Sequence, residues 1–248
     1  MDSASYIPIS LASALQRDLD VTANNIANAN TTGFKRERVA FETYMHQENA
    51  TGEEVSFVVD GGSYLDASAG ALEHTGNPLD LAIEGEGWFA YETEDGTRAY
   101  GRDGRLVLDG QGNLVTLNGS RILDSGGGAI ALDPALATSV AIAEDGTMTG
   151  PDGAPIARVG LFEIADLQSY ERRGGGMFVA PEIGAAPPVP SPTTRVVQGA
   201  VEGSNVQPVT EMTRMIEIQR AYERAMKLMS TADDLRKDAM RRLASPTG

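Results

Sequence analysis

The pattern of apolar positions predicts an α-helix over residues about 5–30. Its apolar seam advances by four, four, three and four residues and consists of Leu11, Leu15, Leu19, Thr22 and Ile26. These steps keep the seam on one face, because an α-helix turns once every 3.6 residues. Pro8 suits the first turns of this helix, and Gly33 ends the segment.

A second and longer helix is predicted over residues 208–243. Pro208 suits its first turn, where the missing N–H costs nothing. The helix carries a broad apolar stripe, which consists of Met212, Met215, Ile218, Tyr222, Ala225, Met229, Ala232 and Leu235. At 1.5 Å per residue this helix is roughly 50 Å long. Each terminal helix therefore has an apolar face that needs a partner, either the other terminal helix or further copies of the protein.

Between the helices the pattern changes to short apolar or alternating runs separated by Asp-Gly pairs. These pairs begin at Asp60, Asp95, Asp103, Asp109, Asp145 and Asp152. An Asp-Gly pair between such runs is a strong signal for a β-hairpin. The pattern predicts one antiparallel β domain, in which the prolines of residues 184–194 place that stretch in a loop and not in a central strand.

The predicted fold class is α+β, with four segments along the chain. Residues 1–34 form the N-terminal helix and an asparagine-rich turn, and residues 35–76 form an extended connector. Residues 77–197 form the central antiparallel β-rich domain. Residues 198–248 form a strand or turn followed by the long helix. The two terminal helices flank the β domain and are expected to pair in the manner of a coiled coil.

Charge is distributed unevenly between these segments. The chain has a formal net charge of −15; residues 47–207 carry −16, against −1 for residues 1–46 and +2 for residues 208–248. An acidic, solvated middle repels nucleic acid and anionic lipid, so we expect no nucleic acid as a partner. Nearly neutral, amphipathic ends suit packing between helices.

The composition excludes some chemistry and some locations. The chain has no cysteine, which excludes disulfides, thiolate nucleophiles and cysteine-based metal sites. No basic residue precedes Arg17 and no continuous apolar run opens the chain, so we expect no cleaved secretory signal peptide. No stretch approaches the roughly 18 apolar residues that a membrane-spanning helix needs, so we expect no membrane insertion.

Two glycine-containing stretches resemble ligand-binding loops. Residues 85–90 have the glycine spacing of a dinucleotide-binding loop, but Trp88 to Tyr91 read as a strand where that loop requires a helix. Residues 109–113 resemble the start of a calcium loop, but Ser120 stands at the twelfth position, where an acidic ligand is needed. Turns between strands are the favoured interpretation of both.

The sequence also lacks a recognisable catalytic constellation. His46 and His74 are the only histidines, and neither has a regular ligand spacing around it. We therefore expect no catalytic residue, no metal, no cofactor and no small-molecule substrate. A structural protein is favoured over two rivals, an enzyme built on the β domain and a surface adhesin.

Asparagines gather where the first predicted helix ends, at Asn24, Asn25, Asn28 and Asn30. Asparagine side chains compete for backbone hydrogen bonds, so they are unfavourable inside a solvated helix. A helix C-cap explains Asn30 and Gly33, with Phe34 packing back, but it leaves the other three unexplained. We expect them to bridge to neighbouring chains or to stabilise the turn.

Residues 23–35 closely resemble the N-terminal signature of the flagellar rod, hook and hook-associated family. Residues 76–89 and 199–206 are similar to central and C-terminal sequences of the same family. Glu211-Met212 and Arg220–Glu223 continue the C-terminal match. The resemblance covers nearly the whole chain.

The resemblance implies a structural subunit of the bacterial flagellar basal body, in the rod that spans the periplasm and transmits torque for motility. Its implied partners are copies of itself, other rod subunits and the flagellar export apparatus, which exports such proteins without a cleaved signal. The terminal helices would form the inner layer of a tube, with the β domain outward. The expected assembly interface consists of Leu11, Leu15, Leu19, Asn24, Asn25, Ile26, Asn28, Asn30, Gly33, Phe34, Ser204, Asn205, Val206, Met212, Met215, Ile218, Arg220, Tyr222 and Met229.

Within the family, the chain length and residues 197–209 favour a proximal rod subunit. A distal rod subunit is the close alternative. A hook-type protein is less favoured, because its central domain is usually larger. One departure from the family pattern is the first helix, which has Ser10 and Ser13 and no glycine before Gly33, whereas relatives often carry a glycine near its start.

Overall fold

The computed structural model describes residues 3–47, 54–181 and 183–244. Its internal contacts divide the chain into two compact units. Unit 1 is drawn from Met1–Ala27, Glu37–Asp66 and Gln207–Gly248, and unit 2 from Asn28–Arg36 and Ala67–Val206. The backbone therefore passes from one unit to the other at four points.

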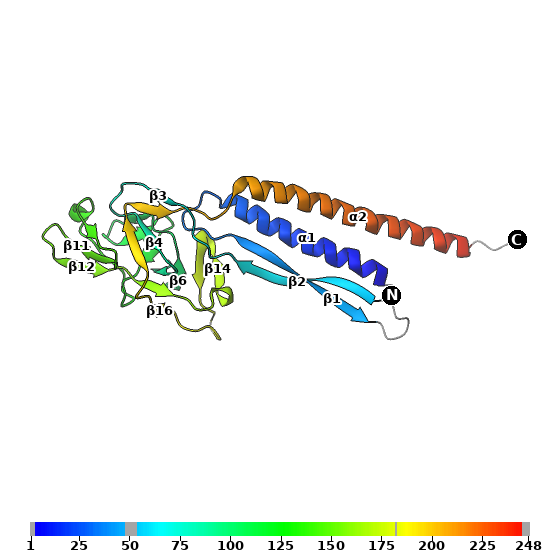
Figure 1. The fold of residues 1–248 in the computed structure, drawn as a ribbon, viewed down its shortest axis with the longest axis horizontal. Coiled ribbons are helices and arrows are strands. Elements are labelled where there is room, and N and C mark those ends of the chain that lie inside the picture. Colours follow the sequence, from blue (N-terminus) through cyan, green and yellow to red (C-terminus); the bar gives the residue numbers. More distant parts are fainter. Residues whose placement is uncertain (1–2, 48–53, 182, 245–248) are drawn as a thin grey trace. The chain divides into compact units, whose positions relative to one another are not determined.

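Unit 1 contains two helices and a β-hairpin. α1 (Ser3–Ala27) and α2 (Pro208–Ala244) lie side by side and run in opposite directions (Figure 1). β1 (Glu37–Gln47) and β2 (Glu54–Leu65) pair antiparallel, and both contact α1. This hairpin lies within residues 35–76, the segment that the sequence pattern assigns to an extended connector. Among the described residues, no helix is long and apolar enough to cross a membrane.

The most buried face of α1 is small and polar. Its members advance by four, four and three residues and are Ala14, Asp18, Thr22 and Asn25. The apolar residues of the predicted seam are only partly buried, namely Leu11, Leu15, Leu19 and Ile26. Small residues at a helix contact let the backbones approach closely, which leaves the larger leucines at the margin of the contact.

Unit 2 is built from short antiparallel strands. They are β3 (Leu72–His74), β4 (Leu81–Glu84), β5 (Trp88–Glu92), β6 (Arg98–Gly101), β7 (Leu106–Leu108), β8 (Leu114–Thr116), β9 (Arg121–Ile122), β10 (Ala141–Ile142), β11 (Thr147–Thr149), β12 (Pro155–Arg158), β13 (Leu161–Glu163), β14 (Glu171–Arg173), β15 (Met177–Val179), β16 (Val189–Pro190), β17 (Arg195–Gln198) and β18 (Ala200–Glu202). Three single-turn 3-10 helices occupy Pro134–Leu136, Leu167–Ser169 and Gly174–Gly176.

The largest sheet of unit 2 has the order β14-β15-β6-β5-β9-β8-β7, and β13 joins it by pairing with β5 and β16. Three smaller sheets have the orders β10-β11-β12, β17-β4 and β18-β3. One hydrophobic core lies between them, and its fully buried members include Leu81, Phe89, Tyr91, Leu106 and Ile122. The structure confirms the α+β class, with an antiparallel β-rich centre between two terminal helices in the sequence.

Asp-Gly pairs make several of the hairpin turns that the sequence predicts. Gly96, Gly146 and Gly153 all have a positive φ, which glycine adopts without strain. In each turn the preceding aspartate accepts a hydrogen bond from the backbone N–H two residues further on. These side-chain bonds stabilise the turn conformation locally.

The pair Asp103-Gly104 is different, because β6 and β7 do not pair and no hairpin forms there. The backbone of Gly104 instead lies against that of Leu81, whose N–H donates to the Gly104 carbonyl at 2.9 Å. A Cβ at residue 104 would lie 1.7 Å from the carbonyl oxygen of Leu81. Position 104 therefore requires glycine because the backbone of Leu81 comes so close, and not because the chain makes a hairpin turn there.

We expect Gly104→Ala to lower the free energy of unfolding by about 1–3 kcal/mol, the usual cost of overpacking a tight site. Gly110→Ala is the matched control, because a Cβ there meets nothing within 4 Å. Urea unfolding of both variants checks the expectation. Equal stability of the two variants would contradict the role given to Gly104.

Candidate assembly site

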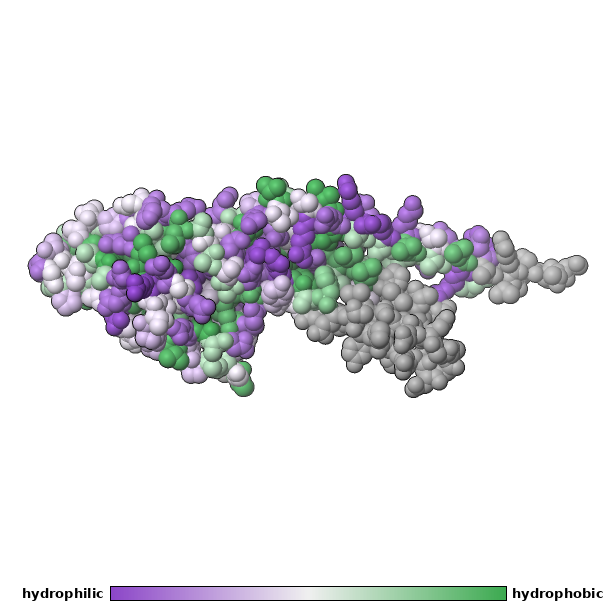
Figure 2. Space-filling model, in the orientation of Figure 1, coloured by the Kyte–Doolittle hydropathy of each residue, from purple (hydrophilic) through white to green (hydrophobic). Residues whose placement is uncertain are grey.

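The predicted interface residues of α2 are distributed around the helix. Ile218 is buried against the rest of unit 1, whereas Met212 and Arg220 are exposed. The partly buried members are Met215, Tyr222 and Met229. Further exposed apolar residues of α2 are Val209, Ile216, Met226, Leu228, Leu235 and Met240. Figure 2 shows apolar and polar side chains interspersed along the visible part of α2.

An ion pair fixes the register of α1 against α2. Arg214 Nη2 donates to both carboxylate oxygens of Asp18, at 2.9 and 3.3 Å. Asp18 is only 5% exposed. A shift of one helix along the other by a turn would leave this buried carboxylate unpaired, which costs several kcal/mol. The pair therefore specifies one alignment of the two helices, as polar residues at helix contacts often do.

The role of Asn25, one of the four clustered asparagines, is found within the chain itself. Its side-chain amide donates to the Glu37 carbonyl at 2.8 Å and accepts from the Glu37 N–H at 3.0 Å. The side chain is buried. It bonds both the N–H and the carbonyl of Glu37, the first residue of β1, as a neighbouring strand would. These two hydrogen bonds join the end of α1 to the start of β1 and so close the loop between them.

The remaining asparagines lie at or near the turn after α1. Asn28 accepts hydrogen bonds from Thr31, one from the backbone N–H to its carbonyl and one from the hydroxyl to its side chain. Asn24 and Asn30 are exposed. The turn ends at Gly33, whose φ of 68° favours glycine and where a Cβ would lie 2.3 Å from the Arg102 carbonyl carbon.

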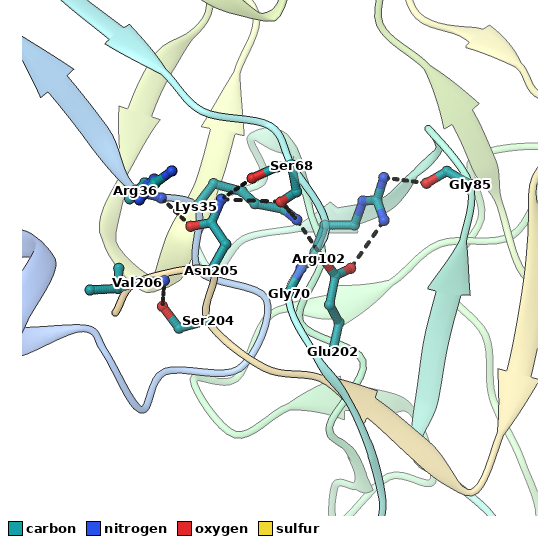
Figure 3. Close-up of polar contacts among 10 residues, drawn as sticks. All are labelled: Lys35, Arg36, Ser68, Gly70, Gly85, Arg102, Glu202, Ser204, Asn205 and Val206. Atoms are coloured by element: carbon teal, nitrogen blue, oxygen red, sulfur yellow. Dashed lines mark hydrogen bonds and ion pairs between the residues drawn. The ribbon is translucent and has the colours of Figure 1, made fainter. Parts of the chain in front are cut away.

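A buried charged cluster, here called the junction network, follows this turn (Figure 3). Lys35 and Arg102 both form ion pairs with Glu202, one at each carboxylate oxygen. All three side chains are at most 3% exposed. The Glu202 carboxylate also accepts from the N–H of Gly70 at 2.8 Å. Three segments distant in sequence are thereby held at one carboxylate.

The outer bonds of the network reach the neighbouring backbone. Lys35 Nζ donates to the Ser68 carbonyl at 2.7 Å, and Arg102 Nη2 donates to the Gly85 carbonyl at 2.7 Å. Asn205 accepts from the N–H of Arg36 at 2.7 Å and donates to the Ser68 carbonyl at 3.1 Å (Figure 3). These bonds use most of the remaining donors and acceptors of the buried charges, which makes their burial tolerable, although the Arg102 Nε is buried without a hydrogen-bond partner.

The aromatic residues of the cluster stack on arginines. Phe34 lies under the guanidinium of Arg172, 4.2 Å from the ring centroid, and Arg172 also donates to the Lys35 carbonyl at 2.6 Å. Arg102 lies over Trp88 at 4.9 Å. Cation–π contacts of this kind add to the burial of the ring. The contacts of Arg172 attach Phe34 and Lys35 to β14 of unit 2.

The network lies where the chain leaves unit 2. Lys35 and Arg36 precede the passage into β1, Ser68 follows the passage out of β2, and Asn205 precedes the passage into α2. Of the predicted site residues, the structure brings Gly33, Phe34 and Asn205 into this region, with Ser204 Oγ accepting from the Val206 N–H at 3.2 Å. The network thus fixes the spacing of three of the four passages within unit 2.

Sequence reasoning missed the charged members of the site. Lys35 and Glu202 lie inside the segments that resemble the flagellar family. A lysine and a glutamate among apolar and small neighbours could have indicated a buried ion pair. Arg102 and Arg172 gave no signal, because their partners are 100 and 137 residues away in the chain. Asp18 has no distinctive signal either, because it lies beside the predicted leucine seam in a chain with many acidic residues.

Asp103, next to Arg102, has a perturbed titration. Burial raises the pKa of its carboxyl from 3.8 to about 6, opposed in part by the backbone N–H and the charge of Arg105. Burial also raises the pKa of Tyr91 well above its usual value, and its hydroxyl donates to the Asp103 carbonyl at 2.6 Å. The carboxyl is therefore protonated more readily in the folded protein than in the unfolded chain.

Residues 85–87 form a turn between β4 and β5, and the strand predicted from Trp88 onward is confirmed as β5. Residues 109–113 form the turn of the β7–β8 hairpin, with Asp109 accepting from the N–H groups of Gln111 and Asn113.

Within the part of the chain that the structure describes, no group of three or more acidic or histidine side chains lies close enough to hold a metal ion. His46 lies among residues whose side chains are outside the description, and His74 is exposed in β3.

Glu202→Gln removes the negative charge between two buried cations and keeps the shape of the side chain. We expect the free energy of unfolding to fall by about 3–5 kcal/mol, the usual effect of breaking a buried ion pair. The control is Glu92→Gln, since Glu92 forms an exposed pair with Arg121 and should change stability by less than about 1 kcal/mol. Urea titrations with equal effects for the two variants would exclude a dominant role for Glu202.

The raised pKa of Asp103 predicts a pH-dependent loss of stability. Between pH 3.8 and about 6 the unfolded chain releases this proton before the folded protein does, so stability falls as pH rises through that window. Relative to Asp103→Asn, the wild-type chain should lose stability up to about pH 6 and stay level above it. Asp109→Asn is the control of opposite sign, because hydrogen bonds from Asn113 lower the pKa of Asp109. A flat difference for Asp103→Asn between pH 4 and 7 would contradict this prediction.

Three family models match the chain. "Flagella basal body rod protein" matches residues 9–35, "Flagellar hook protein FlgE/F/G D1 domain" matches residues 82–150, and "Flagellar basal body rod FlgEFG protein C-terminal" matches residues 197–242. The three charged members of the junction network are divided among them. Lys35 lies in the first match, Arg102 in the second and Glu202 in the third.

Full-length relatives agree with these matches. Flagellar basal-body rod protein FlgF of Caulobacter vibrioides is 40% identical over 98% of both chains, and FlgF of Mesorhizobium japonicum is 38% identical over 99% of both. Flagellar basal-body rod protein FlgG of Bacillus subtilis is 34% identical over 93% of this chain and 95% of its own. The chain therefore belongs to the flagellar basal-body rod protein family.

Proposed function

We propose that the chain is a subunit of the proximal part of the flagellar rod, where copies pack through their terminal helices and transmit torque. The observation that carries this proposal is the exposure of apolar residues on α2 although α1 already packs against it. Met212 and Ile216 are each about half exposed, at 51% and 50%. An amphipathic helix in a self-contained monomer turns its apolar residues inward. Exposed ones on a paired helix suit contacts between subunits.

The distribution of charge supports the same arrangement. Residues 208–248 carry a net charge of only +2, so copies of α2 can gather without strong repulsion. The acidic residues lie mainly in the middle of the chain, which suits a β domain on the solvated outside of a tube. The exposed apolar residues of the helices thus favour the inside of an assembly, and the acidic β domain favours its solvated outside.

The junction network suits a subunit under torsion. A force that acts on the terminal helices reaches the β domain through the four backbone passages. Buried ion pairs and backbone hydrogen bonds at Lys35, Glu202 and Asn205 resist separation of those passages within unit 2. A protein that transmits torque needs such internal connections, whereas an enzyme needs a set of convergent reactive groups instead.

A proximal position is supported by the relatives named FlgF, which reach 40% and 38% identity. The relatives named FlgG reach 36% and 34%, so a distal rod subunit is the alternative. A hook-type axial protein is a weaker candidate. The proposed partners are copies of this chain, neighbouring rod subunits and the flagellar export apparatus. Export without a cleaved signal into the periplasm-spanning rod agrees with a chain that needs no disulfide.

The proposal is tested in the native bacterium by deletion of the gene and electron microscopy of purified basal bodies. We expect a truncated or absent rod and no hook, and the stage of arrest separates a proximal from a distal subunit. Complementation with the double variant Met212→Ser, Ile216→Ser should fail to restore motility, because it makes the exposed stripe polar. The matched control Gln219→Ser changes an exposed polar residue of α2 and should restore it.

Circular dichroism of the purified chains separates assembly from folding, since both variants should keep the helix content of the wild-type protein. A deletion strain with complete hooks, or a chain that is recovered only from the medium, would refute the rod assignment.

A further inference from the structure

The sulfur atoms of the chain are concentrated in α2. The chain has no cysteine, so its nine methionines carry all of its sulfur. Five of the nine lie in α2, although this helix has only 37 of the 248 residues. They are Met212, Met215, Met226, Met229 and Met240. The one kind of side chain that mild oxidants attack here is therefore gathered on one helix.

Three of these methionines form a row along α2. Met212, Met226 and Met240 follow one another at intervals of 14 residues. Fourteen residues make close to four turns of about 3.6 residues, so the three side chains leave the helix on one side. Met212 lies about 120° around the helix from Ile218, and Met226 about 100° from Ala225. Ile218 and Ala225 are buried, so these three methionines, here called the outer methionine row, point away from the covered face.

The outer methionine row is exposed, whereas the methionines of unit 2 are buried. Met212, Met226 and Met240 are 51%, 41% and 59% exposed. Met148 and Met177 belong to the core of the β domain and are 0% and 3% exposed. An oxidant dissolved in water therefore reaches the outer methionine row in the folded chain and does not reach the other two.

We propose that the outer methionine row is a site of reversible oxidation by peroxides, and that its oxidation keeps a free subunit out of the assembly. A peroxide transfers one oxygen atom to the thioether sulfur, which is oxidised to the sulfoxide, and hydrogen peroxide is itself reduced to water. A thiol-dependent methionine sulfoxide reductase removes that oxygen and restores the thioether. The inference rests on the proposed function, because it needs the exposed side of α2 to contact other subunits.

The chemistry of the sulfoxide explains the effect on assembly. The thioether of methionine is apolar and adapts its shape to a neighbouring surface. The sulfoxide is polar and accepts hydrogen bonds, so its burial between subunits without a donor is unfavourable. Three such groups on one side of α2 convert an apolar row into a polar one, while the buried face of the helix stays unchanged.

Mass spectrometry of the purified full-length chain tests the selectivity of oxidation. Hydrogen peroxide should oxidise Met212, Met226 and Met240 at least about tenfold faster than Met148 and Met177, because only the first three are exposed. In urea the rates should converge, since the unfolded chain exposes all of them. A methionine sulfoxide reductase supplied with a thiol should then return the mass of the outer row to its starting value.

Two triple variants of the outer methionine row test the effect on assembly. One combines Met212→Leu, Met226→Leu and Met240→Leu, which stay apolar and take up no oxygen. The other combines Met212→Gln, Met226→Gln and Met240→Gln, which are polar like the sulfoxide. Leucine and glutamine are both good helix formers, so circular dichroism should show equal helix content. In a strain without the native gene, we expect at least about tenfold less glutamine variant than leucine variant in purified basal bodies.

A peroxide pulse in cells that lack methionine sulfoxide reductases provides the direct measurement. The amount of wild-type chain that enters new basal bodies should fall by at least about threefold, and the amount of the leucine variant should stay level. Each strain is compared with itself before the pulse, so an effect of the substitutions on assembly cancels.

Three outcomes overturn the proposal: equal oxidation of exposed and buried methionines in the folded chain, equal amounts of the two triple variants in basal bodies, or an equal loss of the wild-type chain and the leucine variant after the pulse. Each of them leaves the proposed function intact when the untreated wild-type chain is present in basal bodies. If that chain is missing from basal bodies, the proposed function fails, and with it the effect of oxidation on assembly.

Discussion

A carboxylate that is 1% exposed must find its partners inside the protein, because removing a charge from water costs several kcal/mol. Glu202 finds Lys35, Arg102 and the N–H of Gly70, and these partners come from three separate stretches of the chain. The cost of burial is offset only when all of them are in place. The folded arrangement of unit 2 around residues 33–36 and 202–206 is therefore all or none, and the positions of Phe34 and Asn205 follow from it.

Two of the ion-pair sites in this protein act at different levels. The junction network joins segments within unit 2, while Asp18 and Arg214 align two helices within unit 1. Both are polar contacts in places where apolar packing alone would allow several alignments. Apolar contacts supply most of the free energy, but they are tolerant of sliding, and directional bonds select one register. The leucines of α1 then remain at the margin of that contact and are only partly buried.

Periodicity was sufficient to predict both helices and the antiparallel centre, since a helical seam or an Asp-Gly turn depends on residues close in sequence. It failed where the cause is distant. Gly104 looked like another hairpin glycine, but its role is set by Leu81, which meets it through the fold. The pairing of Lys35 with Glu202 spans 167 residues and has no periodic signature. The leucine seam of α1 was correctly placed on a helix, yet the face that is buried most is the polar one beside it.

The four backbone passages between the units have a consequence for damage to the chain. Each unit is assembled from segments that alternate along the sequence, so neither unit is attached to the other by a lone linker. A single break in the backbone at one passage leaves three covalent connections intact. In unit 2 the cut end would still be held by its hydrogen bonds and ion pairs. A nicked subunit would thus stay in one piece under load, which gives the protein a redundancy that a two-domain chain with a single hinge lacks.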